Sequence, residues 1–361
     1  MDMIDVEIML AKVLLIVLMV LQAAPIMAWV ERRGAALIQN RLGPNRVGPL
    51  GLFQSIADAI KAMFKEDLVP AHVSRFYYLL APIACLIPAF MTFAVIPMAA
   101  PITIEGRSIH FQVADLNVGI LYVFAVASLG VFGIIMAGWS SNNKFSLLGS
   151  LRSCSQMISY ELSLGLSVVA LIMVYASVHL GEIVQGQAET LLQLGPIAIP
   201  KLGIFVQPLG FLLFLTAVHA ETNRLPFDLP EGETEIVAGY HTEYGPMGFS
   251  LFMMAEYGNM LTASGLLATL YFGGWQMLPG FAYVHGALGL SGNAHILAGV
   301  GLQFLSLLLK VIFFMLLFVW TRWTLPRFRY DQVMDLGWKV MFPLSLVNIF
   351  ITGALIYLGW I

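Results

Sequence analysis

The chain has 361 residues, 59% of them hydrophobic and only 11% charged, and its net charge is −3. An ordinary soluble domain is about one quarter charged, so a chain this apolar cannot cover a water-facing surface with polar groups. Lipid is the solvent in which such a composition is workable. The small net charge and the lack of a long basic run argue against nucleic-acid binding.

Cysteine and histidine usage argues against a metal centre within the chain. The two cysteines, Cys85 and Cys154, are far apart in the sequence, and the seven histidines are scattered without paired spacing. An iron–sulfur cluster or a structural zinc site needs about four clustered ligands. We therefore expect no metal and no iron–sulfur cluster here.

Long apolar runs predict an all-α polytopic fold in which residues 1–361 form a single membrane domain. A bilayer-spanning helix needs about 20 apolar residues. About eight such runs are present, at residues 8–29, 77–97, 117–138, 157–177, 203–219, 249–273, 296–320 and 340–360. The first run lies between acidic residues and a Glu-Arg-Arg triplet, so we interpret it as a spanning helix and not as a removable signal peptide.

The first connection contains a predicted amphipathic surface helix. Phe53, Ile56 and Ile60 recur at helical spacing, while Asp58 and Lys61 fall on the opposite stripe. Periodicity alone favours a simple interfacial anchor. The preceding stretch, RLGPNRVGPLG, is rich in glycine and proline, which give a loop a defined shape. Together with its arginines, this loop suits a surface that docks an acidic partner or orients a polar ligand head.

Lysine and arginine predict the orientation, because loops rich in these residues stay on the cytoplasmic side. Four alternate connections, at about 30–76, 139–156, 220–248 and 321–339, hold nearly all of them: Arg32, Arg33, Arg41, Arg46, Lys61, Lys65, Arg75, Lys144, Arg152, Arg224, Arg322, Arg327, Arg329 and Lys339. The other connections hold Arg107 and Lys201 only. We therefore expect the four connections to be cytoplasmic and both termini to be periplasmic.

Carboxylates in unexpected places are the main candidates for function. Glu161 and Glu256 lie inside predicted spans, and a charge at the bilayer centre costs on the order of 2.5–3.5 kcal/mol. Such a residue normally faces a protein interior or water, and its default interpretation is functional. The fifth connection is strongly acidic, with Arg224 as its one base, and a solvated loop would account for it. Lys310, within the seventh run, is the candidate to neutralise one of the acids.

Two long motifs point to a family. ERRGAALIQNRLGPNRVGPLG followed by FQSIADAIKAMFKED, and later AETNRLPFDLPEGETE, GYHTEYGPM and AEYGNML, closely resemble the signatures of one membrane subunit of respiratory complex I, the proton-pumping NADH:quinone oxidoreductase. That subunit is called H in bacteria and 1 in mitochondria. The stretch LPRFRYDQVMDLGWKVMFPLSL near the end also matches, so the resemblance covers essentially the whole chain.

The resemblance implies that this subunit forms the membrane-side wall and entrance of the quinone-reduction cavity, which peripheral subunits complete. The residues that it places in this wall or in the docking surface are Glu31, Arg32, Arg33, Arg41, Gly43, Pro44, Asn45, Asp58, Lys61, Phe227 and Asp228. The substrate of the shared site is a quinone, either ubiquinone or menaquinone. NADH oxidation, the flavin and the iron–sulfur clusters belong to other subunits, which agrees with the lack of a glycine-rich nucleotide loop here.

The resemblance also implies that acidic residues couple quinone reduction to proton pumping. The set is Glu161, Glu221, Glu231, Glu233, Glu235 and Glu256, together with Lys310. The implied partners are the peripheral-arm quinone-site and iron–sulfur subunits on the cytoplasmic face and the proton-pumping subunits of the membrane arm. We expect a multi-pass protein of the bacterial inner membrane. The isolated chain should be inactive, because it holds no electron donor.

Other functions are compatible with parts of the sequence. A homologous subunit of a membrane-bound ion-pumping hydrogenase would face a metal-bearing partner in place of quinone, but the complete RLGPNRVGPLG and LPFDLPE stretches favour the quinone enzyme. A secondary transporter would explain Glu161, Glu256 and Lys310, yet transporters usually show internal repeats and interrupted helices. We find no repeat, and the apolar runs read as continuous. A purely structural membrane anchor leaves Glu161 and Glu256 unexplained.

Overall fold

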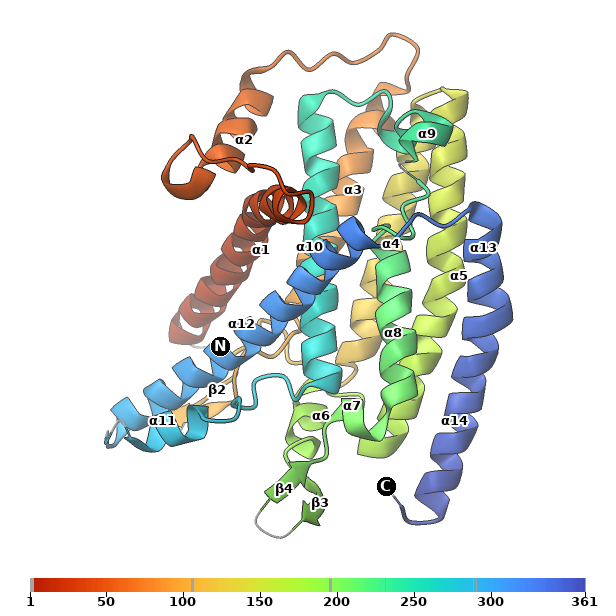
Figure 1. The fold of residues 1–361 in the computed structure, drawn as a ribbon. Coiled ribbons are helices and arrows are strands. Elements are labelled where there is room, and N and C mark those ends of the chain that lie inside the picture. The colour runs from red at the N-terminus through yellow and green to blue at the C-terminus, as the bar shows by residue number, and fades with distance from the viewer. Residues whose placement is uncertain are drawn as a thin grey trace.

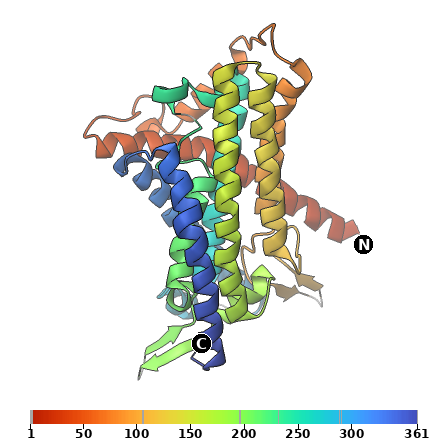
Figure 2. The same ribbon diagram turned by 90° about the vertical axis from the view of Figure 1, so that its right-hand side faces the viewer.

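The computed structural model describes residues 3–104, 107–194, 197–230, 232–287, 289 and 291–360, and within them the chain is almost entirely helical (Figures 1 and 2). The long helices are α1 (Met3–Ile38), α3 (Arg75–Phe93), α4 (Gly119–Ser140), α5 (Lys144–Tyr175), α8 (Pro208–Glu221), α10 (Pro246–Tyr271), α12 (Asn293–Thr324) and α14 (Phe342–Tyr357). The short helices are η1 (Pro49–Gly51), α2 (Gln54–Phe64), α6 (Leu180–Gly186), α7 (Gly203–Val206), α9 (Glu233–Ile236), η2 (Gly239–His241), α11 (Phe281–Ala287), α13 (Tyr330–Asp335) and η3 (Leu336–Met341). Two antiparallel hairpins, β1 (Ile102–Ile104) with β2 (Arg107–Ile109) and β3 (Thr190–Leu194) with β4 (Ile197–Pro200), complete the fold.

Seven of the eight predicted spans each coincide with one helix and the fifth coincides with two, α7 and α8, which confirms the all-α fold. Among the residues that the structure describes, six helices are long and apolar enough to cross a membrane: α1, α3, α4, α5, α12 and the continuous helix Tyr330–Tyr357. The helix α10 is as long, with 26 residues, but it packs against α1, α3 and α12, so its polar side chains face protein and not lipid. The chain is therefore a multi-pass membrane protein.

The connections with most of the basic residues gather at one end of the bundle. In Figure 1, α2 and α9 lie at the upper end, while both hairpins, α6, α7 and α11 lie at the lower end. The helix α1 does not follow the bundle axis but crosses it at a steep inclination (Figure 2). Its 36 residues form a helix roughly 54 Å long at 1.5 Å per residue. Because this exceeds the hydrocarbon thickness of about 30 Å, a tilted course keeps its apolar length within the bilayer.

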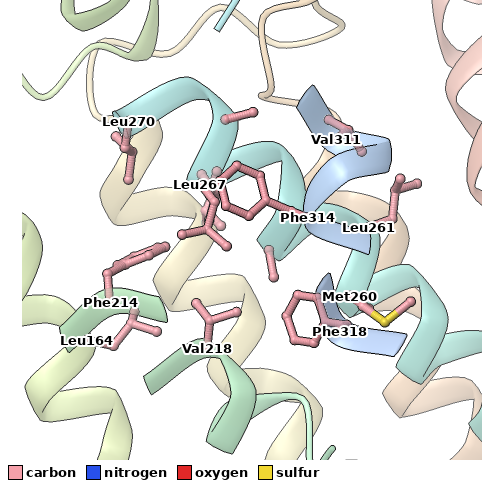
Figure 3. Close-up of a cluster of buried hydrophobic side chains, with 14 of the residues drawn as sticks. Leu164, Phe214, Val218, Met260, Leu261, Leu267, Leu270, Val311, Phe314 and Phe318 are labelled. Atoms are coloured by element: carbon pink, nitrogen blue, oxygen red, sulfur yellow. The ribbon is translucent and has the colours of Figure 1, made fainter. Parts of the chain in front are cut away.

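The interior of the bundle is packed between α8, α10 and α12. Phe214 and Val218 of α8 meet Met260 and Leu267 of α10 and Phe314 of α12 (Figure 3), and none of these side chains is more than 1% exposed. Lipid tails are as apolar as these side chains, so the hydrophobic effect does not drive the helices together. Close van der Waals packing stabilises their association instead.

The fifth predicted span is not one continuous helix, and the prediction of continuous helices is wrong at this point. The short α7 ends at Val206, Gln207 leaves the helical conformation, and α8 restarts with Pro208 at its first position. Proline lacks an N–H and its fixed φ suits the start of a helix, which explains the break. The helix α8 has 14 residues and ends inside the bundle at Glu221, before the irregular segment 222–230 begins.

The segment 222–230 is buried and is not a solvated loop. Arg224 is 2% exposed, Phe227 3%, Asp228 7% and Leu229 1%. Gln156 of α5 holds the segment in place, because its amide Nε2 donates to the carbonyl oxygen of Phe227 at 2.9 Å and to that of Ala220 at 2.8 Å. Irregular backbone at membrane depth is tolerated where protein groups satisfy it. The acidic connection thus enters the bundle instead of staying outside it.

Several helices begin earlier than the apolar runs predicted. The helix α5 begins at Lys144, where the side chain of Asn143 accepts a hydrogen bond from the N–H of Phe145 at 2.9 Å and so caps the helix. Glu161, which is close to the start of the predicted span 157–177, consequently lies near the middle of α5. The last span begins at Tyr330, since its charged first turns, which include Asp331 and Lys339, do not interrupt the helix.

The predicted amphipathic helix in the first connection is confirmed as α2. The loop before it is fixed to the end of α1, because the carbonyl oxygen of Leu50 accepts hydrogen bonds from Arg33 Nη2 at 2.9 Å and from Trp29 Nε1 at 3.1 Å. Gly51 has φ +73° and packs so tightly on Pro44 that a Cβ atom there would overlap its carbonyl oxygen. The loop therefore has a defined shape, as its glycines and prolines predicted.

Candidate functional site

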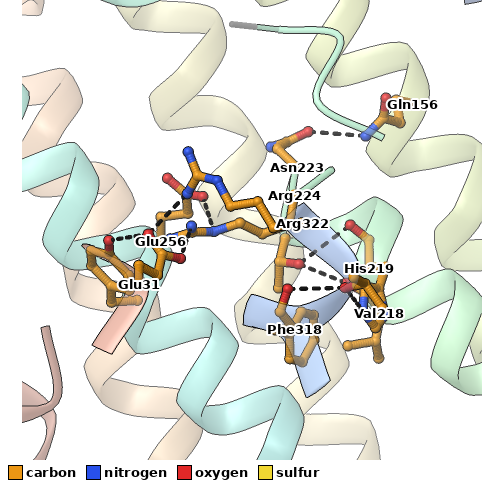
Figure 4. Close-up of polar contacts among 12 residues, drawn as sticks. Glu31, Gln156, Val218, His219, Asn223, Arg224, Glu256, Phe318 and Arg322 are labelled. Atoms are coloured by element: carbon orange, nitrogen blue, oxygen red, sulfur yellow. Dashed lines mark hydrogen bonds and ion pairs between the residues drawn. The ribbon is translucent and has the colours of Figure 1, made fainter. Parts of the chain in front are cut away.

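A cluster of buried charges lies where α1, α10, α12 and the segment 222–230 meet. Arg224 is at its centre, and its guanidinium pairs with Glu31 of α1 through Nη1 and with Glu256 of α10 through Nε (Figure 4). The chain positions Arg224 here because α8 ends three residues earlier and the following backbone turns into the bundle. One arginine thus joins a residue of the first motif to a carboxylate of the sixth span.

Glu31 is the residue that shares most contacts within this cluster. Arg322, near the end of α12, places Nη1 3.0 Å from Glu31 Oε2, and the hydroxyl of Tyr257 donates to the same oxygen at 2.8 Å. The Arg224 guanidinium also lies 4.6 Å from the centre of the Tyr257 ring, a cation–π contact. Two arginines therefore face two glutamates, and the cluster is formally neutral.

The charge of Arg224 is stabilised by its neighbours. Burial opposes the charged form of the guanidinium, and the carboxylates of Glu256 and Glu31 offset this cost. Nη2 of Arg224 is buried and has no hydrogen-bond partner among the residues described. A buried donor without a partner is costly, so this atom is suited to bind a water molecule or a polar ligand.

A second ion pair lies beside the cluster. Asp228 Oδ2 accepts from Arg327 Nη2 at 2.9 Å, and burial raises the pKa of Asp228 while the charge of Arg327 opposes the rise. Phe227 packs edge-on against Tyr160, with ring centres 5.4 Å apart, and also contacts Phe328. The predicted pair Phe227 and Asp228 is therefore anchored within the protein, close to Arg224 in the chain.

Two small cavities border carboxylates of the interior. One, of about 30 Å³, is lined by Glu256, Glu221 and Asn259. The other, also about 30 Å³, is lined by Glu221 and Asn259 again and by Thr92 and Thr262 farther along. A cavity needs roughly 10–15 Å³ on this measure to hold one water molecule. Each cavity can therefore hold water beside a carboxylate, and Glu221 with Asn259 borders both.

Glu161 and Lys310 lie away from the Arg224 cluster. Glu161 accepts a hydrogen bond from the hydroxyl of Ser128 in α4. The ammonium group of Lys310 donates to the carbonyl oxygens of Gly274 and Gln276 at 2.8 Å each. Within the described part of the chain it pairs with no carboxylate, so the expected neutralisation of an acid by Lys310 is not observed. Its partners are the carbonyls that follow the end of α10.

The other predicted residues of the first connection lie near the surface. Arg32 pairs with Asp58 of α2, and Gln54 donates to the same carboxylate at 2.9 Å. Burial opposes ionisation of Asp58, but the hydrogen bonds from Arg32 and Gln54 and the charge of Arg32 together lower its pKa. Arg41 is exposed and donates to Gln39 at 2.7 Å. Of the remaining members, Asn45 and Lys61 are exposed, while Gly43 and Pro44 are half-buried.

The acidic side chains in and around α9 that the structure describes do not join the Arg224 cluster. Glu235 pairs with Arg152 of α5 at 2.6 Å and is a surface contact. Glu231 lies outside the described residues, and the side chain of Glu233 is likewise not described. The structure therefore brings together Glu31 and Glu256, which were predicted to belong to two different sets, and leaves Glu235 apart.

Sequence reasoning missed several members of the site. In the sequence, Arg322, Arg327 and Arg224 serve as orientation charges, and Arg224 is also the one base of the acidic connection. A basic residue embedded among acids is a usable signal for a buried ion pair. Tyr257 and Asn259 gave no such signal, because neutral polar residues in a span carry no obvious penalty.

Comparison with known proteins identifies the family. The sequence profile described as NADH dehydrogenase matches residues 10–353. Proteins named as the H subunit of NADH-quinone oxidoreductase are similar over nearly the full length: 46% identity to that of Bdellovibrio bacteriovorus over 96% of both chains, and 49% to that of Thermomicrobium roseum over 91% of this chain and 89% of the other. An H subunit of the same enzyme from Geobacter metallireducens is 45% identical over 98% of both chains. The chain therefore belongs to the NADH dehydrogenase family of membrane subunits, the respiratory complex I family that its motifs resemble.

Proposed function

We propose that this chain acts as the H subunit of a proton-translocating NADH:quinone oxidoreductase, that it forms the membrane-side wall of the quinone cavity, and that its buried carboxylates couple quinone reduction to proton pumping. The observation that carries the proposal is the Arg224 cluster. Through Arg224 it links Glu31, in the motif of the first connection, to Glu256 in the interior.

The quinone side of the proposal rests on the polar groups at the cytoplasmic end. The rigid loop before α2 and the end of α1 form one fixed unit through Leu50 and Arg33. Arg224 Nη2 and Asp228 Oδ1 are buried atoms without hydrogen-bond partners among the described residues, so both can bind water or a polar head. A quinone, ubiquinone or menaquinone, is the ligand that the family relationship supports.

The coupling side rests on the charge balance of the cluster. Reduction of a quinone to a quinol takes up two electrons and two protons, and charges interact much more strongly in a low-dielectric interior than in water. A change of charge near Glu31 would disturb the pairing of Arg224 with Glu256. Glu256 would then exchange a proton with water in the adjoining cavity, and Glu221 on the far side of that cavity would follow. These carboxylates would titrate as one coupled set.

The proposed partners follow from the quinone side and the coupling side of the proposal. The exposed apolar face of α2 and the arginines around it suit contacts with lipid and with peripheral quinone-site and iron–sulfur subunits, while the helices suit contacts with proton-pumping membrane subunits. In this proposal the peripheral arm lies on the cytoplasmic face of a bacterial inner membrane, and the other arm lies within that membrane. The termini of this chain are then on the periplasmic side. The flavin and the clusters belong to the partners in this proposal.

The first experiment is affinity extraction of the native membrane through a tag on this chain, followed by an assay of the eluate for NADH:quinone reductase activity. A large complex that carries flavin and iron–sulfur centres and reduces quinone supports the proposal. Isolation of the chain alone, or together with a hydrogenase, contradicts it.

The second experiment tests the coupling. Glu221→Gln removes the carboxylate between the two cavities and should lower quinone reduction and proton pumping together in a fully assembled complex. Glu182→Gln is the matched control, because Glu182 is exposed in α6 at the opposite end of the bundle. Normal pumping by assembled Glu221→Gln complex contradicts the proposed route.

A further inference from the structure

A groove lies at the end of the bundle remote from the Arg224 cluster, between the first halves of α1 and α12. Its volume is about 370 Å³, within the range of roughly 300–1,000 Å³ typical of ligand pockets. Leu15 of α1, Phe111 of the segment before α4, and Leu297 and Phe304 of α12 contribute to its walls. We refer to it as the α1–α12 groove.

The groove opens on an exposed apolar surface. Along α1, Leu10 is 59% exposed, Leu14 60% and Leu15 52%, and Leu297 at the start of α12 is 56% exposed. In a membrane protein, exposed apolar residues of this kind are suited to contact with acyl chains. An apolar space beside them excludes water and loses van der Waals contacts while it is empty, so an acyl chain is the occupant that the surroundings supply.

One charged side chain lines the groove, and it has no partner within the described part of the chain. Lys12 makes no hydrogen bond or ion pair there, although the charge of Asp115 acts on it. The carboxylate of Asp115 is already used, because it pairs with His179 at 2.6 Å and His110 at 3.0 Å and accepts from Gln112. A lysine ammonium at the edge of an apolar groove thus remains available to an anion.

The order of residues along the groove fits an amphiphile. The two helices run inward from the same end, α1 from Lys12 toward Ile16 and α12 from Leu297 toward Phe304. A cation therefore lies at the outer part and aromatic and aliphatic walls lie deeper. Lysine side chains characteristically extend their ammonium group toward the membrane interface, where lipid phosphates lie.

We propose that the α1–α12 groove binds one acyl chain of an anionic phospholipid, with the phosphate of its headgroup at Lys12. The site is separate from the quinone and proton-coupling residues, so it goes beyond the proposed function. The bound lipid would fill the space between two inclined helices and fix the position of α1 against α12.

Photo-crosslinking in the intact complex tests this directly. The complex is reconstituted into bilayers of mainly zwitterionic phosphatidylcholine with a minority of phosphatidylglycerol, with a benzophenone amino acid in place of Phe304. The reference position is Phe350, which is 77% exposed on α14 and reports the bulk lipid. Mass spectrometry then identifies the lipid joined to each position. A basic side chain near an anionic lipid should enrich phosphatidylglycerol about fivefold at Phe304 over Phe350.

Two sets of variants distinguish the effect of the Lys12 charge from the effect of the free volume in the α1–α12 groove. Lys12→Gln should abolish the enrichment and Lys12→Arg should keep it. Gly301→Leu should remove the adduct, because Gly301 lines the groove and nothing lies within 4 Å of a Cβ atom there. Gly165→Leu in α5 has the same free space and should have no effect.

Three outcomes would overturn the proposal. The lipids joined to the two positions could have the same composition, or the adduct at Phe304 could be a quinone. No adduct could form at Phe304 or at a second probe in place of Leu297. NADH:quinone reductase activity is measured in parallel, so that loss of the lipid site is distinguishable from failure of the proposed function.

Discussion

At the scale of single residues, the buried charges of the site are tolerated because they balance. Glu31 has three partners, Arg224, Arg322 and Tyr257, and Arg224 in turn has Glu256. Taking an ion out of water costs several kcal/mol in real proteins, and attraction to a partner offsets this only when the geometry is good. Loss of one member should therefore be far more harmful than the modest net value of the ion pairs suggests.

Arg224→Met should destabilise the protein by about 3–5 kcal/mol, the usual cost of leaving a buried charge without its partner. Glu256 would lose its ion pair, so the double variant Arg224→Met/Glu256→Gln should recover part of the loss. The thermal midpoint and the yield of assembled complex measure both. Arg41→Met is the control, since Arg41 is exposed and should change stability by less than about 0.5 kcal/mol. A double variant less stable than Arg224→Met would argue against the pairing.

His241 should make the protein sensitive to mild acid. It is 5% exposed against Phe249 and Phe252, and burial lowers its pKa to about 3 from an ordinary value of 6.5. Below pH 6.5 His241 is protonated in the unfolded chain but stays neutral in the folded chain. The free energy of unfolding should therefore fall by about 1.4 kcal/mol per pH unit until the pH reaches the pKa of the folded state. His241→Phe should flatten the dependence of the thermal midpoint on pH between 6.5 and 5. An unchanged slope would show that other groups set it.

At the scale of elements, the helices were predictable and their interruptions were not. Apolar length decides where a span exists, because lipid leaves the backbone no alternative to internal hydrogen bonds. The break at Gln207 and Pro208, the early end of α8 and the burial of 222–230 depend on partners elsewhere, such as Gln156 of α5. Periodicity cannot report a partner that is distant in the sequence. The loop before α2 was predictable because glycine and proline act locally.

Gly51→Ala should distort that loop and release α2 from α1. The positive φ alone costs an L-residue about 1–2 kcal/mol, and the new Cβ would also overlap Pro44 and lie 2.9 Å from the N atom of Asn45. We expect faster hydrogen exchange in α2 and lower quinone reductase activity. Gly280→Ala is the matched control, because it too has a positive φ but open space around it. Equal effects of the two substitutions would remove the steric part of the argument.

At the scale of the whole molecule, the candidate site was only half predictable. Carboxylates such as Glu161 and Glu256 stand out in a span because of their cost in lipid. Their grouping does not, since the neighbours of Glu256 come from α1, α12 and a segment after α8 that approach one another only in the folded chain. Glu31 therefore looked like part of a surface motif, although it connects that motif with the interior.

Asn259 tests whether the interior works as one hydrated path. It borders the cavity that Glu256 and Glu221 share and also the second cavity beside Glu221, so Asn259→Leu should displace water without removing a carboxylate. If the barrier to proton transfer rises by about 1.4 kcal/mol, quinone reduction and pumping should both fall about tenfold, while reduction of a water-soluble artificial acceptor by NADH continues. Asn259→Ser keeps a polar group that can bind water and should retain most of the activity. Full pumping by assembled Asn259→Leu complex would mean that protons reach Glu221 by another path, and the two cavities would then be packing defects of a bundle whose coupling runs elsewhere.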